Sequence, residues 1–106
     1  MKRHAVTWHP RARADLIALY DWIAARADPA TAYGWTAGIE GHTARLEAFP
    51  DRGTPRDDLV QGLRTIVYRG RTVIAYRVTG AAVEVLRLVH AGQDWQGMGD
   101  ECGRQG

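Results

Sequence analysis

Three strand-like runs in the second half of the chain constrain its fold more than any other feature. The segment from Gly62 to His90 contains three runs rich in β-branched and aromatic residues, separated by Arg69-Gly70-Arg71 and by Thr79-Gly80-Ala81. Runs of this kind, joined by short turns that contain glycine, are typical of an antiparallel meander. Five arginines and only one acid, Glu84, lie in this segment. We therefore expect a small arginine-rich sheet that carries the activity.

The first half of the chain predicts one strand followed by two helices. Residues 4–8 alternate like a strand, and Pro10 suits the first turn of a helix because its missing N–H is not needed there. Asp28 is a suitable N-cap for a second helix that begins at Pro29 and ends at Pro50. Apolar-stripe positions recur every three or four residues: Ala12, Leu16, Leu19, Tyr20, Ile23 and Ala27, then Ala32, Trp35, Ile39, His42, Leu46 and Phe49.

This order of elements predicts an α+β domain. The first strand has to pair with the later sheet to satisfy its backbone hydrogen bonds, and two helices joined by a tight link form an antiparallel hairpin. We predict a β-α-α-β-β-β fold in which the helical hairpin packs on a small, mostly antiparallel four-stranded sheet. Residues 1–95 form this domain, and we expect residues 96–106 to be a disordered tail.

Two features of the second predicted helix depart from a simple apolar stripe. Gly34, Gly38 and Gly41 each cost about 1 kcal/mol relative to alanine inside a helix, and they cluster on a strip beside the stripe. We interpret this strip as a place where another backbone approaches closely; a bent or fraying helix is the alternative. His42 lies on the apolar stripe, and we interpret it as a packed residue rather than a catalyst or a ligand.

Composition limits the classes of function that the chain can have. Its 106 residues with a net charge of +2 fit one soluble globular domain, and no run approaches the roughly 20 apolar residues that span a membrane. Cys102 is the only cysteine, so we expect a cytoplasmic protein with neither metal nor cofactor. Thirteen of its fourteen basic residues are arginine, whose planar fork suits carboxylate or phosphate. The arginine excess therefore suits an acidic protein or a nucleic acid as partner; a high-GC genome that favours arginine codons is the alternative.

Several short segments occur along the chain in a fixed order. They are Val6-Thr7-Trp8-His9-Pro10-Arg11-Ala12 with Asp15-Leu16, Tyr20-Asp21-Trp22-Ile23-Ala24, Asp28-Pro29, Leu46-Glu47-Ala48-Phe49-Pro50-Asp51-Arg52-Gly53, Gly62-Leu63-Arg64, Val73-Ile74-Ala75-Tyr76-Arg77-Val78 and Val85-Leu86-Arg87-Leu88-Val89-His90. This set, which covers about residues 4–95, resembles the RelE/ParE superfamily of toxins from bacterial type II toxin–antitoxin systems, and most of all its ParE branch.

The resemblance implies a toxin that is silenced by a cognate antitoxin, ParD-like or similar, in a hetero-oligomer. The antitoxin wraps the toxin with a C-terminal extended stretch and helix, and it alone contacts operator DNA. ParE-like members are described as poisons of DNA gyrase that block replication. The candidate antitoxin-binding residues are Leu16, Leu19, Tyr20, Ile23, Arg69 and Arg71, and the candidate gyrase-binding residues are Arg64, Arg77, Arg87 and Trp95.

Two alternatives remain open at this point. In a ribosome-dependent mRNA endonuclease, three arginines (Arg64, Arg77 and Arg87) would stabilise phosphate charge and His90 would act as acid or base. Regular alternation, however, places Arg87 and Val89 on one face and Leu86, Leu88 and His90 on the other, unless the strand ends or bulges before His90. The loop before the sheet also has no lysine, and no tyrosine follows Tyr76, whereas the nuclease branch typically has both. The other alternative is a degenerate member that only binds its antitoxin and regulates transcription.

Overall fold

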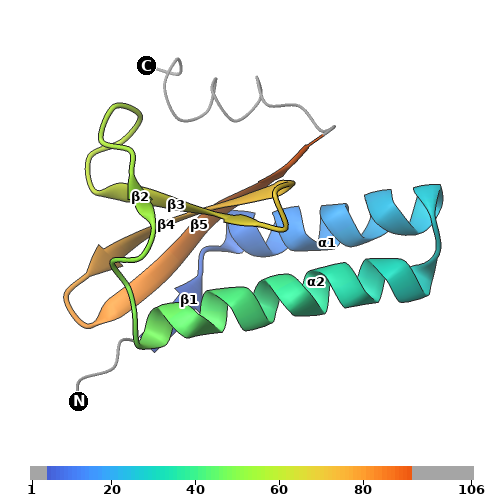
Figure 1. Ribbon diagram of the computed structural model, residues 1–106, viewed down its shortest axis with the longest axis horizontal. Coiled ribbons are helices and arrows are strands. Elements are labelled where there is room, and N and C mark those ends of the chain that lie inside the picture. Colours follow the sequence, from blue (N-terminus) through green and yellow to red (C-terminus); the bar gives the residue numbers. More distant parts are fainter. Residues whose placement is uncertain (1–4, 92–106) are drawn as a thin grey trace.

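The computed structural model describes residues 5–91, which form two helices packed on one five-stranded sheet (Figure 1). In chain order the elements are β1 (Ala5–Trp8), α1 (Pro10–Arg26), α2 (Pro29–Ala44), the 3₁₀ turn η1 (Arg45–Glu47), β2 (Thr54–Pro55), β3 (Leu63–Tyr68), β4 (Thr72–Thr79) and β5 (Ala82–His90). The predicted α+β fold is therefore confirmed. Trp95, Cys102 and the expected tail lie outside the described residues.

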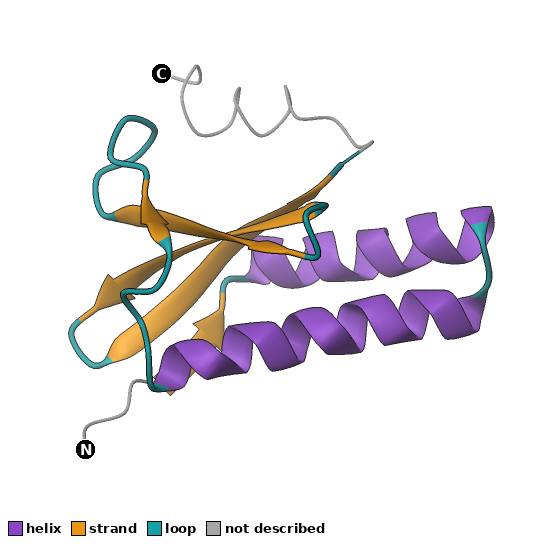
Figure 2. Ribbon diagram, in the orientation of Figure 1, coloured by secondary structure: helices purple, strands orange, loops and turns teal. Residues whose placement is uncertain are grey.

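The sheet has the strand order β1-β5-β4-β3-β2, and both helices lie on the same side of it (Figure 2). β1 pairs with β5 in parallel, with Val6 opposite Val83, and all other pairs are antiparallel. The predicted pairing of the first strand with the later sheet is confirmed. The sheet has one strand more than the four predicted, because the two residues of β2 pair with β3. A two-residue strand that contains a proline has no periodic signal in the sequence.

The core lies between the helical hairpin and the sheet. It combines stripe residues from both helices with the helix-facing side chains of β3, β4 and β5: Ala12, Leu19, Ile23, Ala32, Ile39, Leu46, Ile66, Tyr68, Ile74, Tyr76, Val83, Val85 and Leu88. A smaller cluster of Leu63, Ala75 and Val89 is buried on the opposite face of the sheet, beneath Leu59, Val60 and Leu86. Within residues 5–91, neither helix is long and apolar enough to cross a membrane.

Both helices begin where the sequence predicted, but α2 ends earlier than predicted. The Asp28 side chain accepts a hydrogen bond from the Thr31 backbone N–H at 2.7 Å, and this bond keeps the pKa of Asp28 below its usual value. α2 ends at Ala44 and continues as η1, so the prediction that the helix reaches Pro50 is wrong. Phe49 is consequently displaced from the apolar stripe, and 65% of its surface is exposed.

Of the three glycines of α2, only Gly38 is closely approached. A Cβ atom at Gly38 would overlap the hydroxyl group of Tyr68, whereas a Cβ atom at Gly34 or Gly41 would meet nothing within 4 Å. The strip was expected to admit another backbone, and that interpretation is wrong. Gly38 instead makes room for one aromatic side chain of β3, which allows the sheet to pack closely on α2.

β5 departs from regular alternation in its middle. Arg87 lies opposite Ala75, but Val85 lies opposite the next residue, Tyr76, so Leu86 is an extra residue in a β-bulge. Leu86 therefore packs with the cluster on the far face of the sheet. The prediction that Leu86 shares a face with Leu88 and His90 is wrong, because a bulge shifts alternation by one residue. Leu88 and His90 do share the face that meets the helices.

Candidate functional site

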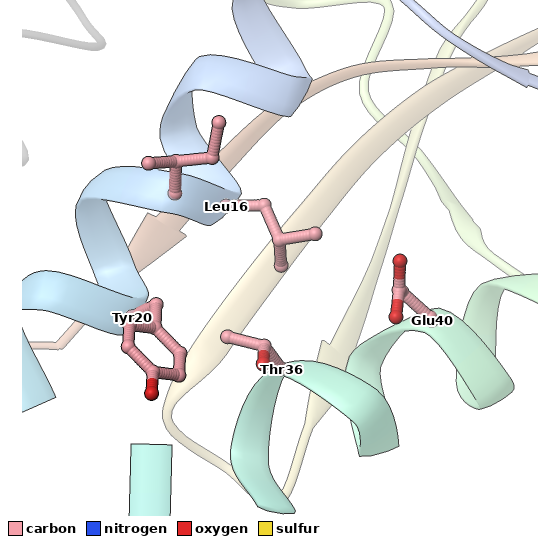
Figure 3. A pocket seen from close by; sticks show the side chains of 5 residues that line it. Leu16, Tyr20, Thr36 and Glu40 are labelled. Atoms are coloured by element: carbon pink, nitrogen blue, oxygen red, sulfur yellow. The ribbon is translucent and has the colours of Figure 1, made fainter. Parts of the chain in front are cut away.

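A groove lies between α1 and α2. Leu16, Ile17 and Tyr20 line it from α1, and Thr36 and Glu40 line it from α2, around a hollow of about 310 Å³. In Figure 3, Leu16 and Tyr20 on one helix face Thr36 and Glu40 on the other. The Thr36 hydroxyl donates to the Ala32 carbonyl oxygen of its own helix, so this residue presents mainly its methyl group to the groove. The groove is therefore largely apolar, with a carboxylate at one end.

Sequence reasoning missed three residues of the groove: Thr36, Glu40 and the large aliphatic residue Ile17. The Ile17 side chain is 65% exposed, and together with Leu16 and Tyr20 it forms a contiguous apolar surface, which is more informative than a single exposed residue. The sequence did contain a signal for Ile17. This residue directly follows Leu16 and therefore lies outside the apolar stripe of α1 that faces the core. An apolar residue off that stripe indicates that the helix has a second apolar face.

The six residues predicted to bind an antitoxin lie in three different places. Leu16 and Tyr20 line the groove. Leu19 and Ile23 are only 1% and 8% exposed, and they pack in the core between the hairpin and the sheet. Arg69 and Arg71 lie in the turn between β3 and β4. Only Leu16 and Tyr20 therefore belong to the surface between the helices.

Arg64 holds a loop in place. Its Nη1 donates to the carbonyl oxygens of Asp51 at 3.1 Å and Gly53 at 2.8 Å. Tyr76, which is fully buried, fixes the same loop from below: its hydroxyl donates to the Pro50 carbonyl oxygen at 2.8 Å and accepts from the Gly53 N–H at 2.9 Å. Burial raises the pKa of Tyr76 above its usual value. These contacts anchor the backbone of residues 50–53 to β3 and β4.

Arg87 joins the edge of β5 to α1. Its Nε and Nη2 donate to the Asp15 carboxylate at 2.7 and 3.2 Å, and the same carboxylate accepts from the Leu88 backbone N–H at 3.0 Å. Both side chains are about four-fifths buried. β1 pairs with β5 only as far as Val85, so Asp15 satisfies a backbone donor that lies beyond the end of β1.

Arg77 lies on a different part of the molecule. It is opposite Glu84 in the sheet, and its Nη2 is 3.4 Å from the Glu84 carboxylate. Its side chain keeps 46% of its surface exposed. Among the three arginines considered as nuclease or gyrase-binding residues, Arg77 is the most accessible to another macromolecule.

His90 is buried between two tryptophans. Its ring meets Trp22 and Trp35 edge-on, at centroid distances of 5.3 and 5.5 Å. The Trp35 indole N–H donates to the Thr72 hydroxyl at 2.9 Å, and the same hydroxyl is hydrogen-bonded to Nδ1 of His90 at 2.7 Å, where the tautomer of His90 sets the direction. Burial, and then the charge of Arg71, lower the pKa of His90 below its usual value. His90 is therefore a neutral, 5% exposed packing residue at neutral pH.

The structure does not bring the candidate nuclease residues together. Arg64 binds a loop, Arg77 pairs on the sheet surface, Arg87 is held by α1, and His90 lies between the helices and the sheet. Within residues 5–91, the His, Cys, Asp and Glu side chains form no group that could hold a metal ion. What the described surface offers is an apolar groove and accessible arginines, which suit binding better than proton transfer.

Comparison with known proteins gives concordant results. The model of the family described as "ParE toxin of type II toxin-antitoxin system, parDE" matches residues 6–95. A solved chain of the chromosomal ParDE system from P. aeruginosa is 27% identical, with 83% of this chain and 96% of that chain covered and a TM-score of 0.74. A chain of the toxin–antitoxin complex RelBE2 from Mycobacterium tuberculosis is 26% identical, with 88% and 97% covered and a TM-score of 0.62. Among curated proteins, no sequence matches significantly.

Proposed function

The chain belongs to the ParE family of toxins from type II toxin–antitoxin systems, and from this premise we propose two features of its action. The first is that a cognate antitoxin silences it by placing an apolar segment in the groove between α1 and α2. The second is that the toxin inhibits DNA gyrase by binding to it, without chemistry of its own.

The exposed side chain of Ile17 on the groove wall supports the first feature. An amphipathic helix buries its apolar face in a groove of this kind, and burying a large aliphatic side chain contributes roughly 1.5–3 kcal/mol. The two similar solved structures are both toxin–antitoxin systems. An antitoxin partner in the groove accounts for an apolar surface that the toxin alone leaves in water.

The test of the first feature is a pair of charge substitutions on α1. Ile17→Glu should weaken binding of the antitoxin encoded by the adjacent small open reading frame by about 10- to 100-fold, as judged from the transfer energy. Ala18→Glu is the matched control, because Ala18 is exposed on the same helix and does not line the groove. Equal affinities for the two variants, measured by titration calorimetry, would place the antitoxin elsewhere.

The separation of the candidate nuclease residues supports the second feature. His90 is enclosed by rings, and Arg64 and Arg87 already bind parts of the toxin itself. Arg77 is the exposed arginine that we propose as a contact with gyrase, since arginine is a frequent anchor at protein interfaces. A toxin that works through such a surface needs complementarity to its target, and it needs no acid–base pair.

Two assays on one preparation of the full chain test the second feature. The protein should inhibit gyrase-catalysed supercoiling, and Arg77→Ala should inhibit less than the unmodified chain. His90→Asn, which replaces an enclosed ring, should inhibit as well as the unmodified chain provided that it folds, as checked by circular dichroism. Cleavage of mRNA in a translating extract, with no effect on gyrase, would reverse the proposal.

A further inference from the structure

A row of cations and aromatic rings follows the side of α2 that lies next to β3. We call it the α2 flank, and it consists of Arg69, Trp35, Tyr68, His42, Arg45, Arg52 and Phe49. The Arg69 guanidinium lies over the rings of Trp35 and Tyr68, at 5.6 and 5.5 Å from their centroids. Tyr68 in turn meets Trp35 at 5.3 Å and His42 at 5.6 Å. Arg69, Trp35, Tyr68 and His42 are therefore connected by direct contacts along α2.

The row ends in an open hollow beyond the C-terminus of α2. Arg45, Arg52 and Phe49 line it together with Ala44, Glu47 and Ala48, around a volume of about 430 Å³. The loop that carries Arg52 is held by Arg64 and Tyr76, so the backbone that carries this cation is fixed next to the hollow. The exposed ring of Phe49 lies in the same hollow, where it offers an aromatic face to a ligand.

The flank carries three arginines, Arg45, Arg52 and Arg69, against one carboxylate, Glu47, which lines the same hollow. The ion pairs within residues 5–91 lie at Arg56, Arg64, Arg77 and Arg87, so the guanidinium groups of Arg45, Arg52 and Arg69 are available to an anion. Burial, and then the charges of Arg52 and Arg45, lower the pKa of His42 below its usual value. At neutral pH this histidine is therefore an uncharged ring in the row.

Arg69 also has an unusual backbone conformation. Its φ of 53° is the only positive value at a non-glycine residue among those described, and Gly70 follows with a φ of 70°. Turns with two positive φ values favour asparagine or glycine at the first position, so arginine here carries some backbone strain. The conformation nevertheless places the guanidinium over two aromatic rings of the flank.

We propose that the α2 flank binds a single-stranded nucleic acid, with phosphates on Arg45, Arg52 and Arg69 and a base stacked on Phe49. Cationic grooves with exposed aromatic rings are the common means of holding single strands, because every base has a face that can stack. From Trp35 to Ala44 the helical part of the flank spans roughly 14 Å at about 1.5 Å per residue, and the hollow extends it further, which is room for several nucleotides. The proposal requires neither antitoxin nor gyrase, and so goes beyond the proposed function.

Fluorescence anisotropy with the full chain and labelled ten-nucleotide strands of thymidine or uridine tests the proposal. Three phosphate contacts predict a slope of about −2 for log K against log salt concentration, and Arg52→Ala should reduce its magnitude by about 0.7. Phe49→Ala should weaken binding by about 5- to 100-fold without changing the slope. Binding of either polymer supports the proposal, and their ratio distinguishes DNA from RNA.

Arg13→Ala is the matched control. Arg13 is exposed and lies over Trp8, at the opposite edge of the sheet from β3, so its loss removes one charge without touching the flank. It should leave the affinity and the slope unchanged. Equal losses for Arg13→Ala and Arg52→Ala would overturn the proposal, as would equal affinity for a duplex, equal affinity for a ten-residue glutamate peptide, or no binding at 50 mM salt.

Discussion

Replacing Tyr76 by phenylalanine tests how the loop before the sheet is held. The substitution removes a single oxygen that is fully buried and makes two hydrogen bonds, one to the Pro50 carbonyl oxygen and one from the Gly53 N–H. Because Gly53 is itself buried, its N–H has no access to water once the oxygen is gone. The variant therefore keeps a buried donor that cannot be satisfied.

The expected cost follows from these contacts. A typical intramolecular hydrogen bond contributes about 1 kcal/mol, and a buried donor left unsatisfied costs about 1–3 kcal/mol. We expect Tyr76→Phe to lower the free energy of unfolding by about 2–4 kcal/mol. A domain of this size has a total of roughly 5–15 kcal/mol, so the midpoint of thermal unfolding should fall by at least about 10 °C.

Urea unfolding monitored by circular dichroism measures this loss, and Tyr68→Phe is its matched control. Tyr68 is also nearly buried, but its hydroxyl lies against the backbone of Gly38, so we expect a loss below about 1 kcal/mol. Amide exchange should also become faster at Gly53 in Tyr76→Phe. Equal losses for the two variants would show that the hydroxyl of Tyr76 does not hold the loop.

Two further predictions concern His90 and Gly38. Because the pKa of His90 is lowered in the folded state, the unfolded state takes up its proton first, so the free energy of unfolding should decrease as the pH falls below about 6.5. His42 contributes in the same direction, so urea titrations of His90→Asn should show a weaker pH dependence rather than none. Gly34→Ala and Gly41→Ala should stabilise the protein by up to about 1 kcal/mol. Gly38→Ala should destabilise it, because the added Cβ would overlap Tyr68. A thermal unfolding midpoint for Gly38→Ala as high as those of the other two variants would refute this packing.

Local patterns in the sequence were sufficient for most of the fold. The spacing of apolar residues located both helices and the three long strands, and the Asp28-Pro29 pair marked the start of α2. Each of these features depends on residues within a few positions of one another. The end of α2 was predicted too late because Leu46 continues the apolar spacing even though the backbone tightens into η1 at Arg45.

The features that sequence reasoning missed depend on distant partners. Arg87 was recognised as a cation, but its partner Asp15 is 72 positions away. In the sequence Tyr76 has the pattern of an ordinary strand residue, and its hydrogen bond with Gly53, 23 positions earlier, cannot be predicted from that pattern. The bulge at Leu86 likewise depends on the register between β4 and β5. Sequence reasoning could therefore name the arginines of the sheet without saying which of them are available to a partner.

The position of α2 allows the toxin to use two surfaces at once. Ala32, Ile39 and Thr43 face the core, while Thr36 and Glu40 line the groove on one side of the helix and Trp35 and His42 belong to the α2 flank on the other. At about 100° per residue, these sets occupy separate sectors of one helix. An antitoxin segment in the groove would therefore leave the flank open. If both proposals hold, the toxin–antitoxin complex should bind a single strand as tightly as the free toxin does, and competition between the two ligands would show that one of the sites is misplaced.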